Sequence, residues 1–144
     1  MAATNFVSLS YPKVRESLEK VVKIVRTDTT AFVGAWLPKD AVLTGMYVVG
    51  QAASNAGTTA TIDVGTTASA NELLASYDVR TAATGEGYNP AGAAAVGTAF
   101  MEKRTTDVPI YAKYTESGTA SSAGGPWYVK IEYSVVGGGE TIQL

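Results

Sequence analysis

The side chains that most often carry out catalysis are scarce in this chain. Histidine and cysteine are both absent from its 144 residues. A Ser-His-Asp or Cys-His nucleophile is therefore impossible, and so is a zinc site built from nitrogen and sulfur ligands. A paired-carboxylate site would have to bring together groups such as Asp63, Asp78 and Glu132 across a cleft. We interpret these three as isolated surface carboxylates.

Two other kinds of ligand-binding sequence are missing as well. Gly85-Glu86-Gly87 lacks both the lysine and the following helix N-terminus of a phosphate-binding loop. Asp28, Asp40 and Asp107 stand singly, without the dense Asp/Asn spacing of a calcium loop. We therefore predict a protein that is not an enzyme and needs no cofactor and no metal.

Aromatic side chains leave a binding function open. Trp36, Tyr47, Tyr88, Trp127 and Tyr128 could stack against sugar rings, as in sandwich-type carbohydrate-binding modules. Because neighbouring residues of a strand face opposite sides, only one of Trp127 and Tyr128 can belong to a stacking face. For Trp36 and Trp127 we favour packing in the core.

The length of the chain indicates a single domain, and its net charge indicates no affinity for nucleic acid or for an anionic membrane. A domain of 144 residues can bury about 68–70% of its unfolded surface, enough to fold without disulfides or metals. A net charge of −2 gives no attraction to nucleic acid or to an anionic membrane. The longest apolar run, residues 31–37, is far short of the ~20 residues that span a bilayer, and the N-terminus lacks the features of a secretory signal. We expect a soluble protein made in the cytoplasm, with an N-terminal arm (1–13) and one domain (14–144).

Alternating and β-branched runs predict strands through most of the chain. The predicted strands cover about residues 19–26, 31–37, 41–49, 59–64, 108–115 and 127–135. Residues 41–49 are expected to form the central strand and to return, through a turn at Asn55-Ala56-Gly57, as the strand 59–64. The strand 31–37, which carries Phe32, Val33 and Trp36, is expected to be buried.

One short helix is predicted near residues 70–77. Its residues are good helix formers, Ser69 is a plausible N-cap, and Glu72 follows three residues later, as in a capping box. Residues 81–99 are predicted to form a long Gly/Ala-rich loop, of a kind that is most often functional or stabilised by a partner. Since no βαβ alternation is present, the pattern favours an all-β fold: an antiparallel, jelly-roll-like β-sandwich with this one helix and the N-terminal arm.

The first 26 residues provide a candidate contact surface. The arm carries apolar and aromatic side chains that could dock on a partner or on the domain itself. Residues 13–26 have a net charge of +3, which fits either a solvated strand face or a contact with an acidic neighbour. The candidate contact residues are Phe6, Val7, Leu9, Tyr11, Lys13, Arg15, Lys20 and Lys23.

Four stretches of the sequence stand out: Leu37 to Val49, Thr61-Ile62-Asp63-Val64-Gly65, Asn71-Glu72-Leu73-Leu74, and Trp127 to Tyr133. Together they resemble small virion structural proteins of tailed bacteriophages, and the resemblance covers roughly residues 31–135.

This resemblance implies a capsid decoration or cement protein of the head auxiliary type. Such proteins sit on the outside of the virion, often as homotrimers, and stabilise the capsid by bridging subunits of the major capsid protein. The arm and the basic segment would then grip the capsid, while loops 81–99 and 116–126 order on assembly. The competing prediction is a phage tail, neck or fibre module, or a carbohydrate-binding sandwich for host-surface attachment.

Overall fold

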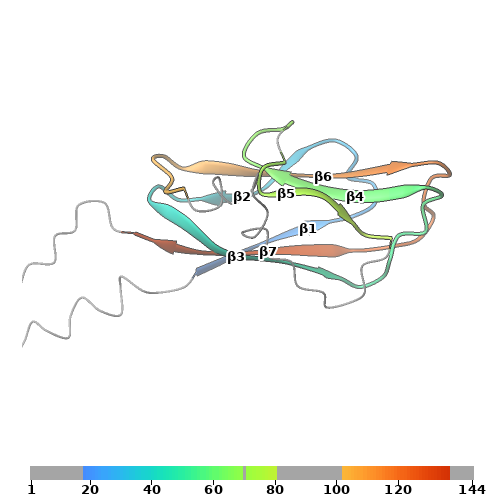
Figure 1. Cartoon of the computed structure of the whole chain (residues 1–144), viewed down its shortest axis with the longest axis horizontal. Helices are drawn as coiled ribbons and strands as arrows, with labels where there is room; N and C mark the ends of the chain where they lie inside the picture. The colour runs from blue at the N-terminus through green and yellow to red at the C-terminus, as the bar shows by residue number, and fades with distance from the viewer. Residues whose placement is uncertain (1–17, 70, 81–101, 137–144) are drawn as a thin grey trace, which may run out of the picture.

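Two antiparallel β-sheets pack face to face in the computed structural model, which describes residues 18–69, 71–80 and 102–136 (Figure 1). One sheet has the order β1 (Leu18–Ile24), β7 (Trp127–Val135), β3 (Ala41–Gly50). The other has the order β2 (Phe32–Leu37), β6 (Val108–Ser117), β4 (Thr59–Gly65), β5 (Leu74–Asp78). The predicted antiparallel β-sandwich is confirmed. Within the described ranges, no helix is long and apolar enough to cross a membrane.

The strand order follows the wrapping of a jelly roll. From β1 to β4, successive strands alternate between the two sheets. The last two strands then enter the middle of the sheets, with β6 between β2 and β4 and β7 between β1 and β3. Seven strands are described, against the eight of a complete double-sheet jelly roll.

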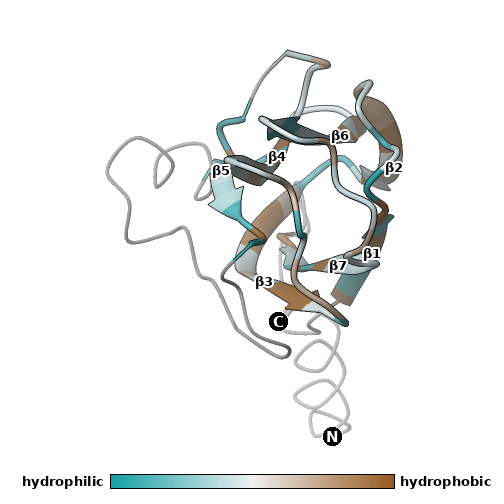
Figure 2. Ribbon diagram, turned by 90° about the vertical axis from the view of Figure 1, so that its right-hand side faces the viewer, coloured by the Kyte–Doolittle hydropathy of each residue, from teal (hydrophilic) through white to brown (hydrophobic). Residues whose placement is uncertain are grey.

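Period-2 alternation places one apolar core between the two sheets. Figure 2 shows the sheets end-on. In β7 the side chains from Trp127 to Tyr133 are alternately buried and partly exposed, as their pattern predicts. Trp127 stacks on Tyr114 of the opposite sheet, with ring centroids 5.4 Å apart and ring planes at 10°. Stacked aromatic pairs add about 0.5–1.5 kcal/mol beyond their buried area, so this contact ties the two sheets together.

Among the described strands, β3 is not the central strand that its apolar run predicts. Among the described strands it pairs only with β7, which is the middle strand of that sheet. The predicted return to β4 is also wrong as a hairpin, because β4 pairs with β5 and β6 in the other sheet. A strand at the edge of a sandwich buries one face as a central strand does, so an apolar run does not reveal the strand's position in the sheet.

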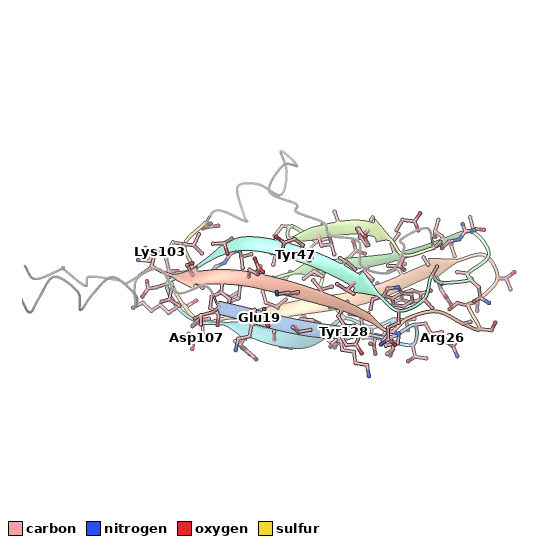
Figure 3. The ribbon with its side chains drawn as sticks, turned by 90° about the horizontal axis from the view of Figure 1, so that it is seen from below. Glu19, Arg26, Tyr47, Lys103, Asp107 and Tyr128 are labelled. Carbon is pink, nitrogen blue, oxygen red and sulfur yellow. The ribbon has the colours of Figure 1, made fainter. Side chains whose placement is uncertain are left out.

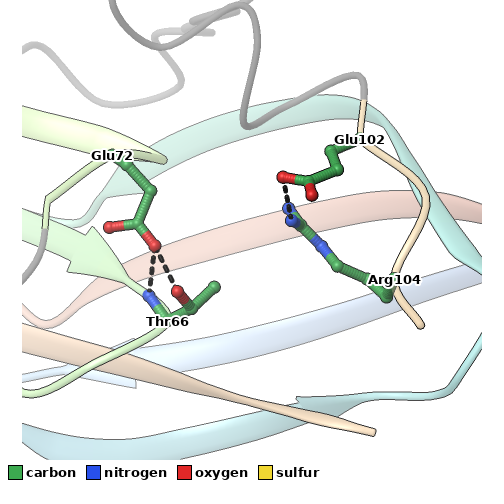
Figure 4. Close-up of polar contacts among 4 residues, drawn as sticks. All are labelled: Thr66, Glu72, Glu102 and Arg104. Carbon is green, nitrogen blue, oxygen red and sulfur yellow. Dashed lines mark hydrogen bonds and ion pairs between the residues drawn. The ribbon is translucent and has the colours of Figure 1, made fainter. Parts of the chain in front are cut away.

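The helix predicted near residues 70–77 is wrong as well. Leu74–Asp78 is the strand β5, antiparallel to β4, and none of the described residues there is helical. Glu72 does accept hydrogen bonds, but from Thr66 and not from a helix N-terminus (Figure 4). Pairing with β4 outweighs the local helix propensity, which is only a weak preference.

Candidate functional site

A β-bulge turns Trp36 from the core to the surface. The pairing of β2 with β6 shifts register between Val33 and Ala35, so that Gly34 is an extra residue. In a regular strand, Phe32 and Trp36 would share one face. With the bulge, Phe32 packs on the core and Leu37 is buried, while Trp36 points outward.

Packing against β1 requires glycine at the bulge. A Cβ atom at Gly34 would lie 2.3 Å from Cγ1 of Val22, far closer than real Cβ contacts. Val22 itself is fully buried. Trp36 remains 56% exposed, so its predicted place in the core is wrong, whereas that of Trp127 is confirmed.

Trp36 belongs to an exposed apolar patch on the four-stranded sheet. Val33 is 41% exposed and lies opposite Tyr111 of β6, and Trp36 lies opposite Pro109. We call these four residues the tryptophan patch. Apolar clusters on a protein surface mark interaction sites, and tryptophan is enriched among the residues that carry most of the binding energy at interfaces.

The outer face of the three-stranded sheet carries a second exposed apolar group (Figure 3). Val49 of β3 lies opposite Tyr128 of β7, and Lys130 lies between Val21 of β1 and Tyr47 of β3. Val21, Tyr47 and Val49 are exposed, and Tyr128 is half-buried. We call the four uncharged residues the tyrosine face.

An ion-pair network neutralises the lysine within the tyrosine face. Lys130 Nζ lies 2.9 Å from Glu19 Oε2 and 3.2 Å from Glu132 Oε1. The Glu19 carboxylate, and after it that of Glu132, raises the pKa of Lys130. This surface therefore offers no excess positive charge to an anionic polymer, and it suits a contact with another protein.

Two of the predicted contact residues lie on β1. Lys20 and Lys23 are three positions apart and so point to opposite sides of the strand, Lys23 outward beside the tyrosine face. The other six lie outside the described residues: Phe6, Val7, Leu9, Tyr11, Lys13 and Arg15. The predicted loop 81–99, which includes Tyr88, lies outside them too. Their part in binding stays a prediction.

The loop that follows β6 is held by side-chain hydrogen bonds. Glu116 accepts from the Ser121 backbone N–H at 3.2 Å and from the Tyr114 hydroxyl at 2.7 Å. Hydrogen bonding to the Ser121 side chain, and after it to the Tyr114 hydroxyl, lowers the pKa of Glu116. Tyr114 also bonds to Ser54 Oγ at 2.8 Å, and its burial raises the pKa of its phenol.

The carboxylates considered for catalysis do not share one site. Glu132 lies on the three-stranded sheet, whereas Asp63 and Asp78 lie on β4 and β5 of the other. Across the part of the chain that the structure describes, no group of three or more potential acidic metal ligands occurs.

Comparison with known proteins gives one informative similarity. No protein-family model matches the chain, and no curated protein matches it. A solved chain of the "Cyanophage Pam1 capsid asymmetric unit" is similar, with a TM-score of 0.55 and 19% sequence identity, over 83% of this chain and 84% of that one. The two coverages are nearly equal, so the two chains have similar lengths. At this identity the similarity is one of fold.

Proposed function

We propose that this protein is a non-enzymatic virion structural protein, which decorates a phage capsid on its outside and bridges subunits of the major capsid protein. The observation that carries the proposal is Trp36, held in solvent by the bulge at Gly34. The shared fold with a chain of similar length from a phage capsid unit supports the same role.

Bridging needs two separate contact surfaces, and the sandwich offers two. The tryptophan patch lies on the outer face of the four-stranded sheet, and the tyrosine face lies on the outer face of the other. Both contain aromatic residues, which are enriched in protein interfaces. One molecule can therefore hold two neighbours, one on each side.

The strand β1, which follows the arm in the sequence, begins at the same end of the sandwich as Trp36. Leu18 pairs with Tyr133, and Ala41 pairs with Val135, so β1 begins at the end of the sandwich where β7 ends and β3 begins. Trp36 lies at this same end, one residue before β2 finishes. The arm and the patch can therefore contact the same capsid subunit.

Many copies on one particle would strengthen weak individual contacts. We propose a homotrimer, as the resemblance to decoration proteins implies, because linked binding sites raise the overall affinity without any new contact. The native mass of the purified chain tests this, and a monomeric mass at micromolar concentration contradicts the trimer.

Copy number per virion tests the proposed role. Densitometry of purified particles should give hundreds of copies, in a fixed ratio to the major capsid protein. A few copies per particle would contradict decoration and favour a tail, neck or fibre module. Deleting residues 1–12 should leave a folded domain that binds the capsid more weakly, and unchanged occupancy would exclude the arm from the contact.

A further inference from the structure

A polar pocket opens on the outer face of the four-stranded sheet. It has a volume of about 260 Å³ and is lined by Asp63, Ala68, Ser69, Asn71 and Lys113. Asp63 of β4 and Lys113 of β6 are directly opposite each other in the sheet. These two described side chains nevertheless form no ion pair with each other. Opposite charges thus face one pocket without neutralising each other by contact.

The Asp63 carboxylate is held in a fixed orientation. Its Oδ1 accepts a hydrogen bond from the Ser76 backbone N–H at 2.8 Å and lies 3.5 Å from Nδ2 of Asn71. Asp63 sits where the pairing of β4 with β5 shifts register, and Ser76 has a φ of 48°, a left-handed value that is uncommon for a residue other than glycine. Such local strain often accompanies a functional site. The arrangement leaves Oδ2 of Asp63 for a ligand.

The loop that forms the pocket wall is fixed at both ends. Glu72 Oε1 accepts hydrogen bonds from the backbone N–H of Thr66, at 2.8 Å, and from its hydroxyl (Figure 4). The Leu73 N–H donates to the Val64 carbonyl at 3.1 Å. Thr66, Glu72 and Leu73, which flank the pocket, are therefore positioned before any ligand arrives, which reduces the entropy lost on binding.

The charged and polar groups that line the pocket limit the kinds of molecule that it can bind. A single carboxylate is a poor site for a hard cation, which takes six or more oxygen ligands. With Lys113 opposite Asp63 the lining has no net charge and so does not select an anion, and a polar lining gives little to an apolar molecule. Sugar hydroxyls both donate and accept hydrogen bonds, so one can donate to Asp63 while its neighbour accepts from Lys113.

We propose that this pocket binds one ring of a neutral saccharide. Its volume lies below the range of about 300–1,000 Å³ typical of sites for drug-sized ligands, which suits a single ring. Saccharide binding is separate from the proposed capsid contact and would give the chain a ligand on the host surface.

Titration of the full-length chain with sugars tests the proposal. The probes are neutral hexoses, 6-deoxyhexoses and N-acetylhexosamines at millimolar concentration, followed by ¹H–¹⁵N NMR. At least one sugar should shift the amide signals of Asn71, Ser76 and Lys113. Asp63→Asn and Lys113→Gln should each weaken binding about tenfold or more, because each removes a charged hydrogen-bonding group.

Control variants outside the pocket show whether a loss of sugar binding is specific to the pocket residues. Asp107 also accepts a backbone hydrogen bond at 2.8 Å, from Lys39, so Asp107→Asn removes the same kind of contact at another place. Lys39→Gln removes an exposed lysine that does not line the pocket. Both should bind as the unaltered chain does. If Asp63→Asn does not fold, Lys113→Gln still tests the proposal, since it breaks no ion pair.

Three results would overturn the proposal. One is the absence of shifts at the pocket amides with every sugar tested. Another is unchanged affinity in Lys113→Gln. The third is a response to free glycine in place of sugars, which would show that the pocket selects a zwitterion.

Discussion

Gly34 should tolerate a larger side chain only if Val22 is made smaller. In Gly34→Ala the new Cβ would lie 2.3 Å from Val22 Cγ1 and 3.1 Å from Cγ2, inside a buried contact between β1 and β2. Val22 is β-branched and cannot easily rotate away. Overpacking of this kind costs about 1–3 kcal/mol of unfolding free energy.

Val22→Ala removes both clashing methyl groups. On its own it should cost about 2 kcal/mol, from lost burial and from the cavity left behind. The closest remaining contact to the new Cβ, from the β-carbon of residue 22, is 3.2 Å, which a small adjustment relieves. In this background Gly34→Ala should be neutral, or stabilising by about 0.4–1 kcal/mol through the reduced entropy of the unfolded chain.

Urea unfolding, followed by circular dichroism, gives the unfolding free energies of the unaltered chain, the two single variants and the double variant. Together these four values measure the energetic coupling between positions 22 and 34. The double variant should be more stable than the sum of the single effects predicts, by about 1–3 kcal/mol. Additive effects, within about 0.5 kcal/mol, would refute the close contact and with it the reason for glycine at the bulge.

Three further predictions concern the loops and the core. Tyr114→Phe removes the hydroxyl that bonds to Ser54 and Glu116, and the loss of these two hydrogen bonds should lower the unfolding free energy by about 1–3 kcal/mol. Tyr111→Phe at the surface should change it little, and equal losses would contradict the buried network. The folded pKa of Glu116 is lowered, so its contribution to stability is present above the unfolded value of about 4.3 and is lost as pH falls through the folded pKa. Acid unfolding should therefore depend less on pH in Glu116→Gln, and an unchanged pH dependence would exclude this role. Glu72→Ala should speed hydrogen exchange at the amides of the loop that it closes, and unaltered exchange would show that the loop is held by other contacts.

Side-chain alternation predicts the strands of this chain well. The run from Trp127 to Val135 is the strand β7 with the predicted bounds, and Ile62 and Val64 face the core while Asp63 faces outward, as expected. These properties depend on neighbours along the chain and on which face meets water, and both are visible in a sequence.

Which strands pair or pack together cannot be predicted from the sequence in the same way. The outward turn of Trp36 depends on contact between Gly34 and Val22, which belong to different sheets. The strand at Leu74 replaces the predicted helix because β4 is available to pair with it. Short apolar or helix-favouring stretches do not encode such choices locally.

Both candidate surfaces arise from residues that are distant in sequence. The tryptophan patch joins Val33 to Tyr111, and the tyrosine face joins Val49 to Tyr128. The sequence shows which residues are aromatic, but which of them lie together on the surface depends on the register in which the strands pair. The sequence does not reveal the polar pocket, because Asp63 and Lys113 become neighbours only through the pairing of β4 with β6.

Capsid binding by Trp36 variants tests the central claim most directly. Capsid shells assembled without this protein are mixed with the purified chain, and the bound fraction is measured by co-sedimentation. Trp36→Ser should remain folded, since the side chain is 56% exposed, yet should lose about 2 kcal/mol or more of binding free energy, roughly thirtyfold in affinity. Trp36→Phe should retain most of the binding, and Thr115→Ala, an exposed change elsewhere on β6, should retain all of it. Full occupancy of the shells by Trp36→Ser would contradict the proposed capsid contact.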